Sequence, residues 1–139
     1  MRVLLSINPT HVANIFSGNK TFEFRRKIFA RKDVKTVVVY CTMPIGKIVG
    51  EFDIDSILAD FPEKIWDETQ EGSGITKGFF DEYFSGRDIA YALKIGDVRE
   101  YDEHVDPKEV LSNFTPPQSY MYMKDERIAQ NSREQLDFW

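Results

Sequence analysis

The first 25 residues of the chain constrain its fold most, because three secondary-structure patterns follow one another there without a long loop between them. Residues 3–7 form a nearly continuous apolar run, typical of a central strand that is covered on both faces. An Asn cap, a Pro in the first turn and a Gly stop then predict a helix over Pro9–Ser17. In residues 21–25 polar side chains alternate with two phenylalanines, which predicts a strand with one polar face.

The rest of the chain is predicted to add mainly strands and short helices. In order, these are strands over 35–42 and 47–54, helices from Pro62 and over 75–84, strands over 89–95 and 98–101, a short helix from Asp106, and a closing strand over 120–123. This order excludes a regular alternation of parallel strands and helices. We therefore predict an α+β fold in which a small β-barrel, or a mixed and curled sheet of about five to six strands, carries peripheral helices.

Length and composition indicate one compact domain, which we expect over residues 1–123, followed by a tail over 124–139. The chain has 139 residues, of which 42% are hydrophobic and 29% are charged. No apolar run approaches the roughly 18 to 20 residues that cross a bilayer, and the N-terminus lacks a secretory leader, so we expect a cytoplasmic protein without a membrane partner. Because Cys41 is the single cysteine and there are two histidines, we expect no disulfide, metal or cofactor, with His11 on an exposed helix face.

The charges of the chain are segregated along the sequence. Although the net charge is −5, residues 20–35 contain seven Lys or Arg against two carboxylates, and residues 51–82 contain ten carboxylates against two Lys. A basic edge of this kind can bind a polyanion while the protein stays soluble. The alternative is that both stretches are ordinary solvated surfaces.

A motif directly after the predicted helix gives the sequence a family resemblance. Residues 18–26 read GNKTFEFRR and resemble the G-x-K-x-x-E-x-R hallmark of the ASCH domain family. Segments similar to that family follow in order at 50–52, 73–76, 90–93 and 116–119. Over residues 1–123 the chain looks like the small stand-alone members found in prokaryotes and phages. The resemblance implies a PUA-like β-barrel with a cleft, and a role in binding RNA or a nucleotide during translation, RNA metabolism or its regulation.

Lys20, Glu23 and Arg25 form the predicted centre of the ligand site. Glu23 and Arg25 leave one face of their strand and Lys20 immediately precedes it, so the three groups can converge. Arg25 can hold a phosphate or carbonyl oxygen, Lys20 can bind an anion or act as a base, and Glu23 can accept hydrogen bonds from a base edge. The alternative is a surface salt bridge that contributes about 0 to 1 kcal/mol.

The resemblance also implies an enzymatic alternative in the same cleft. Some ASCH members resemble amidohydrolases that act on N4-acetylcytidine, and others have been described as ribonucleases. In the deacetylating relatives the catalytic trio is a Lys, a Thr and a Glu. By position the Lys falls on Lys20 and the Glu on Glu71, whereas the position of the Thr holds Glu23 here. The hydrolase hypothesis therefore uses Lys20 with Glu23 or Glu71 as proton-transfer groups.

Further candidates surround this centre. They are Arg26, Lys27, Arg31 and Lys32 in a basic loop that can follow a phosphate backbone, Tyr40 and Tyr91 as stacking or core aromatics, and Gln118 and Ser119 as cleft or turn residues. A third hypothesis is a protein-interaction adaptor, in which the acidic segment or the tail contacts a protein partner.

Overall fold

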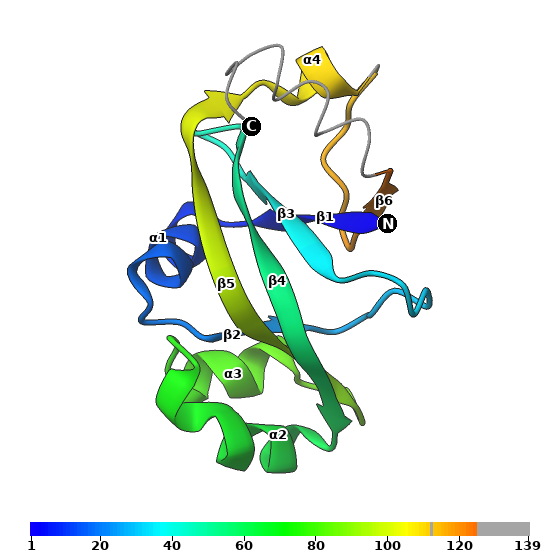
Figure 1. The fold of residues 1–139 in the computed structure, drawn as a ribbon. Coiled ribbons are helices and arrows are strands. Elements are labelled where there is room, and N and C mark those ends of the chain that lie inside the picture. The colour runs from blue at the N-terminus through cyan, green and yellow to red at the C-terminus, as the bar shows by residue number, and fades with distance from the viewer. Residues whose placement is uncertain (112, 125–139) are drawn as a thin grey trace.

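A computed structural model of the chain describes residues 1–111 and 113–124 (Figure 1). Its elements in chain order are β1 (Arg2–Ile7), α1 (Pro9–Ser17), β2 (Phe22–Arg25), β3 (Thr36–Cys41), β4 (Lys47–Asp60), α2 (Pro62–Thr69), the 3-10 helix η1 (Gln70–Gly72), α3 (Lys77–Tyr83), β5 (Ala90–Val105), α4 (Pro107–Val110) and β6 (Met121–Met123). The strands form a mixed six-stranded sheet in the order β2-β5-β4-β3-β1-β6. The predicted α+β class is therefore confirmed.

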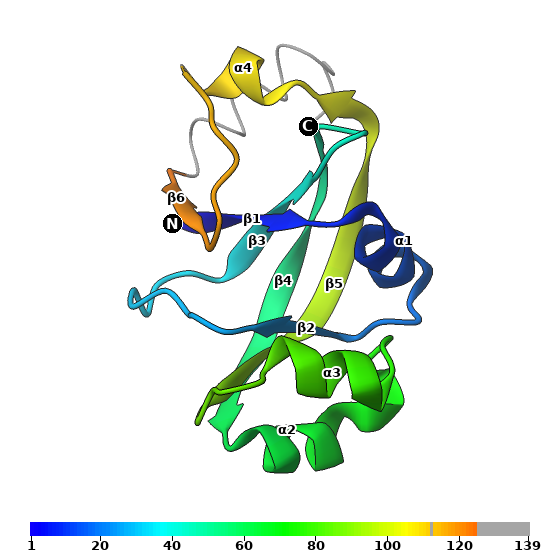
Figure 2. The same ribbon diagram turned by 180° about the vertical axis from the view of Figure 1, so that it is seen from behind.

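The sheet is curled and open. β1 runs parallel to β3, and the other neighbouring strands pair antiparallel. The long strands β4 and β5 run side by side through most of the molecule (Figures 1 and 2). β1 crosses one half of this pair of strands, and β2 crosses the other half. Within the described part of the chain, the edge strands β2 and β6 do not pair with each other. The prediction of a small, mixed and curled sheet of about five to six strands with peripheral helices is therefore confirmed, and over the described residues the sheet does not close on itself.

Most predicted elements are confirmed, but the two strands expected over 89–95 and 98–101 are one continuous strand, β5. Gly96 and Asp97 interrupt the apolar pattern without ending the strand. Ile95 pairs with Ile54 and Val98 pairs with Phe52, so β5 accommodates one extra residue in a register shift. The helix Pro9–Ser17 has the predicted bounds, because the Asn8 side chain accepts a hydrogen bond from the His11 N–H and Gly18 adopts a left-handed conformation.

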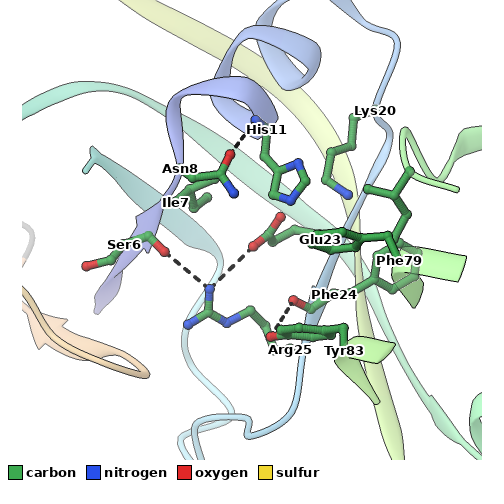
Figure 3. Close-up of a pocket in the computed structure, with 11 residues that line it drawn as sticks. Ser6, Ile7, Asn8, His11, Lys20, Glu23, Phe24, Arg25, Phe79 and Tyr83 are labelled. Atoms are coloured by element: carbon green, nitrogen blue, oxygen red, sulfur yellow. Dashed lines mark hydrogen bonds and ion pairs between the residues drawn. The ribbon is translucent and has the colours of Figure 1, made fainter. Parts of the chain in front are cut away.

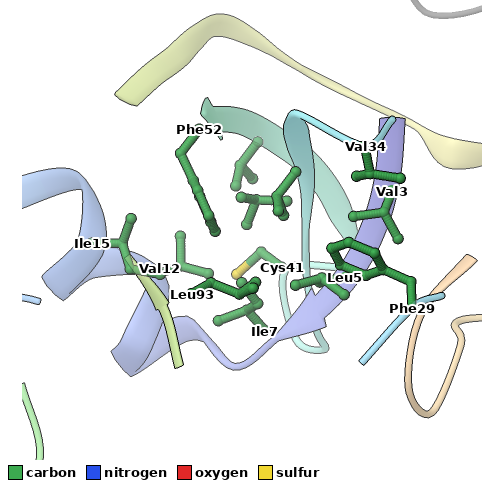
Figure 4. Close-up of a cluster of buried hydrophobic side chains, with 13 residues drawn as sticks. Val3, Leu5, Ile7, Val12, Ile15, Phe29, Val34, Cys41, Phe52 and Leu93 are labelled. Atoms are coloured by element: carbon green, nitrogen blue, oxygen red, sulfur yellow. The ribbon is translucent and has the colours of Figure 1, made fainter. Parts of the chain in front are cut away.

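The main apolar core lies between the sheet and α1 (Figure 4). β1 contributes Leu5 and Ile7, α1 contributes Val12 and Ile15, and Cys41 lies among them as expected. A second cluster joins α2 and α3 to β2 and β5, and it contains Phe24, Phe80, Phe84 and Ala92. These two cores hold α1 and α3 on either side of β2, the strand that carries the predicted motif.

A buried carboxylate, Glu51 on β4, organises a polar network outside the apolar clusters. Glu51 accepts hydrogen bonds from Arg2 at 2.9 Å, from Arg99 at 2.6 and 2.9 Å, and from the Tyr101 hydroxyl at 2.8 Å. Arg99 also donates to Asp53 at 2.6 Å. The network thus ties β1, β4 and β5 together by charge-assisted hydrogen bonds.

The predicted tail lies outside the described residues except for Lys124. In the part of the chain that the structure describes, no helix has the length and apolar character needed to span a membrane.

Candidate functional site

A pocket of about 170 Å³ lies where β1, α1, β2 and α3 meet (Figure 3). Its lining combines polar side chains with aromatic ones, and includes Ser6, His11, Lys20, Glu23, Arg25, Phe79 and Tyr83. The structure therefore brings the three predicted motif residues together in one concave site. It adds Ser6 and His11, which the sequence did not single out.

Lys20 is held in the pocket by its backbone and by its ammonium group. It follows the left-handed stop of α1, and its N–H donates to the Asn14 carbonyl at 3.0 Å. The side chain is 2% exposed, and Nζ donates to the Ser73 carbonyl at 2.8 Å and lies 4.7 Å from the centre of the Phe24 ring. Gly74 lies against the lysine stem, where a Cβ atom would come within 2.7 Å of the Lys20 Cβ. The ammonium is thereby fixed at the pocket wall.

Glu23 and Arg25 form a buried ion pair rather than a surface salt bridge. Nη1 of Arg25 donates to Oε2 of Glu23 at 3.3 Å and to the Ser6 carbonyl at 3.4 Å, and both side chains are buried. Nη2 of Arg25 donates to the Ser119 carbonyl at 2.5 Å. Removing both charges from water has a desolvation cost that the attraction between them only partly offsets. A buried pair of this kind is therefore more typical of a functional site than of a stabilising surface contact.

His11 faces the pocket, so the expectation of an exposed helix face is wrong. Its ring meets the Phe79 ring edge-on at 5.6 Å between centroids, and Figure 3 shows the imidazole beside Lys20 and Glu23. The signal in the sequence is its position four residues before the buried Ile15, which places both on one helix face.

Two buried polar atoms of the pocket have no hydrogen-bond partner among the described residues. They are Nδ1 of His11 and Oγ of Ser6, and they are the only such side-chain atoms in that part of the chain. Buried polar groups are normally satisfied, and an orphan donor or acceptor costs about 1–3 kcal/mol. Two of them beside one pocket indicate a site whose polar groups the protein itself leaves unsatisfied.

Burial in the pocket disfavours the charged forms of both His11 and Lys20, so the pKa values of both are lowered. Burial lowers the pKa of His11 from its ordinary value of 6.5, the charge of Lys20 lowers this pKa further, and Glu23 opposes both effects. Burial also lowers the pKa of Lys20, again opposed by Glu23. The pocket thus combines a proton acceptor, a proton donor and a carboxylate, which is the composition of a binding or acid–base site.

A second, strongly basic pocket of about 300 Å³ adjoins the first and shares Arg25 and Tyr83 with it. Its other lining residues are Arg26, Lys27, Arg87, Gln118 and Ser119. Four of these residues were predicted as candidates and thus lie together beside Arg25: they are Arg26, Lys27, Gln118 and Ser119. Arg87 was not predicted, because nothing in the sequence shows that the turn after α3 reaches the motif strand.

The remaining candidates line neither of these two pockets. Arg31 is exposed and ion-pairs with Asp33 at 2.8 Å, and Lys32 is exposed on the same loop. Tyr40 is a core residue packed against the Phe114 ring. Tyr91 is half-buried on β5 and pairs with Arg25 of β2. Glu71 is exposed on η1.

The open, curled sheet with its peripheral helices has the fold of known ASCH domain structures, which is PUA-like. A crystal structure of ASCH from Zymomonas mobilis superposes with a TM-score of 0.87 at 25% identity, covering 96% of this chain and 94% of that one. The model of a family described as Domain of unknown function (DUF365) matches residues 3–115, and the chain belongs to this family.

Two curated proteins are similar to this chain in sequence. The ASCH domain-containing ribonuclease of Zymomonas mobilis is 27% identical over 125 residues, which cover 88% of this chain and 84% of the relative. The large ribosomal subunit protein uL22 of Ureaplasma parvum is 30% identical over 123 residues, which cover 88% of this chain. The chain spans 39% of the length of that ribosomal relative.

Proposed function

We propose that this protein binds single-stranded RNA, or a nucleotide derived from it, with one nucleobase in the pocket around Lys20, Glu23 and Arg25. The observation that carries the proposal is the meeting of these three charged groups with the unpartnered polar atoms of Ser6 and His11. Together they present both donors and acceptors, which a base edge requires for recognition.

The size and the aromatic wall of the pocket support a single base as its occupant. About 170 Å³ is less than the roughly 300–1,000 Å³ typical of sites for drug-sized ligands, so several nucleotides do not fit inside. Phe79 is 46% exposed at the pocket, and its ring stacks on that of Tyr83 at an interplanar angle of 11°. An exposed aromatic of this kind can stack on a base, with a contribution of about 1–3 kcal/mol.

The name of one relative points in the same direction. The relative that this chain covers over 84% of its length is a ribonuclease, whose substrate is RNA. A role in translation, RNA metabolism or its regulation follows as part of the proposal, and a cytoplasmic location agrees with it.

Titration of a labelled short single-stranded RNA tests this function. Lys20→Met retains most of the side-chain volume but removes the charge, and Glu23→Gln retains the shape but removes the negative charge. We expect each to weaken binding about tenfold or more, since a charge-assisted hydrogen bond contributes about 1.5–3 kcal/mol. Lys64→Met, which alters an exposed lysine paired with Asp60, is the matched control. Equal binding by all four proteins would exclude the pocket as the RNA site.

A second candidate function, RNA cleavage in the same pocket, is favoured by the position of His11. In this scheme the neutral imidazole accepts the proton of a ribose 2′-hydroxyl, whose oxygen attacks the adjacent phosphorus. The bond to the 5′-oxygen breaks, and Lys20 donates a proton to that leaving oxygen, giving a cyclic phosphate and a free 5′-hydroxyl. Deacetylation has less support. Lys20 lines the pocket, but Glu71 is exposed outside it, and Thr21, the Thr two residues from the position of the relatives' catalytic Thr, is exposed with its hydroxyl bonded to the Gly72 carbonyl.

Cleavage is tested with a labelled RNA and a matching RNA that carries a single 2′-deoxy nucleotide. The scheme predicts that the wild type cuts the first at that nucleotide and not the second, and that His11→Asn abolishes cutting even at RNA concentrations that saturate the variant. Cutting of both RNAs at the same nucleotide would refute the role given to the 2′-hydroxyl. Binding without cutting would leave the first function alone.

A further inference from the structure

Three cations gather at the basic pocket without a neutralising carboxylate among the described residues. Arg26, Lys27 and Arg87 have no ion pair with a carboxylate in the described part of the chain. By contrast, carboxylates lie within 4.0 Å of five cations on the strands and helices, namely Lys47, Lys64, Lys77, Lys94 and Arg99. In a protein with a net charge of −5, three uncompensated cations at one concavity indicate an anion as their partner.

The Arg26 guanidinium and the Arg87 backbone are held in place by contacts within the protein. Nε of Arg26 donates to the Tyr83 carbonyl at 2.7 Å, and its guanidinium lies 4.2 Å from the centre of the Tyr83 ring. These contacts fix the guanidinium plane and leave its terminal nitrogens available. The N–H of Arg87 donates to the Phe84 carbonyl at 2.9 Å, which fixes the turn after α3. An anion that binds here therefore meets at least one guanidinium, that of Arg26, that is already positioned.

The basic pocket and the motif pocket are two halves of one site. Arg25 and Tyr83 line both of them. Arg25 joins the halves physically, because one terminal nitrogen binds Glu23 and the other binds the Ser119 carbonyl. A ligand that fills both halves needs a planar polar group attached to an anion at short distance.

We propose that the basic pocket is a phosphate subsite, so that the protein recognises a phosphorylated nucleotide unit rather than a free nucleoside. The base enters the motif pocket, and its phosphate is held by Arg26, Lys27 and Arg87. This inference rests on the proposed function, and it defines the ligand class of the same site. The phosphate can belong to an RNA strand or to a nucleoside monophosphate, since both present the same group.

Binding measurements on Arg87→Ala test the subsite, with Arg31→Ala as the matched control on a cation that is already paired with Asp33. The probes are short single-stranded RNA, nucleoside 5′- and 3′-monophosphates and the unphosphorylated nucleosides. For Arg87→Ala we expect about tenfold weaker binding of RNA and monophosphates, with nucleoside binding unchanged. Between about 50 and 200 mM salt, the log–log slope for RNA should become less steep by about 0.7. Arg31→Ala should change neither quantity.

The outcomes separate this inference from the proposed function. If Lys20→Met loses binding while Arg87→Ala retains the wild-type affinity and salt slope, the base pocket is correct and the phosphate subsite is wrong. If nucleosides bind as tightly as their monophosphates, the subsite is likewise refuted. If RNA alone shows the Arg87 effect, the phosphate belongs to a strand, whereas an equal effect on a monophosphate assigns it to a free nucleotide. If neither RNA nor any monophosphate binds the wild type, both proposals fail.

Discussion

Replacing Gly74 with Ala tests how Lys20 is positioned. Gly74 has a φ of +68°, and an added Cβ would lie 2.7 Å from the Lys20 Cβ and 2.8 Å from its Cγ. A left-handed conformation costs a non-glycine residue about 1–2 kcal/mol, and overpacking adds about 1–3 kcal/mol. Gly18 is the matched control, because its φ is +87° and a Cβ there meets no atom within 4 Å.

We expect Gly18→Ala to lower the free energy of unfolding by about 1–2 kcal/mol, and Gly74→Ala to lower it by about 1–3 kcal/mol more. Urea denaturation measures both values. At a temperature where both variants are folded, Gly74→Ala should bind RNA about tenfold more weakly, because the displaced ammonium loses a contact of about 1.5 kcal/mol. Equal destabilisation by the two variants would refute the packing argument, and unchanged affinity would show that Lys20 does not touch the ligand.

Three further perturbations follow from the buried polar groups. Because the pKa of His11 is lowered, the unfolded chain binds this proton more tightly, so the free energy of unfolding should fall as pH drops below about 6.5. His11→Asn should make the fall shallower in urea titrations across that range, and a parallel curve would contradict the burial of the ring. Lys20→Met should change the midpoint of thermal unfolding little, because the lost bond to the Ser73 carbonyl is offset by removing a buried charge; a large loss of stability would show that the lysine is structural. Glu51→Gln should cost about 1.5–3 kcal/mol in urea denaturation and leave RNA affinity unchanged, since Glu51 lines neither pocket.

The elements that the sequence predicts well are those with local signals at both ends. The helix Pro9–Ser17 has a cap, a first-turn Pro and a Gly stop within its own few residues, and its bounds are confirmed. β5 lacks such signals in its middle. Whether Gly96 ends a strand depends on the partner β4, whose register shift absorbs the irregularity, and this is a property of the pair rather than of either segment.

The same distinction applies to the site. Lys20, Glu23 and Arg25 lie within one strand and the turn before it, so their convergence follows from local alternation. His11 and Arg87 reach the site only because α1 and α3 pack on either side of β2, which depends on contacts between distant segments. Tyr40 shows the converse: its position in a strand permitted a role at the cleft, but the core on that side of the sheet encloses it.

The contact between Arg25 and the Ser119 carbonyl spans 94 positions along the chain. During synthesis on the ribosome, the motif strand emerges early, whereas the carbonyl that fixes its guanidinium emerges only after the two central strands and both flanking helices. Under the proposed function, the nascent protein cannot hold its ligand in the final geometry until Ser119 has left the exit tunnel. The proposed binding then requires that segments from the start of the chain and from after its central strands have met.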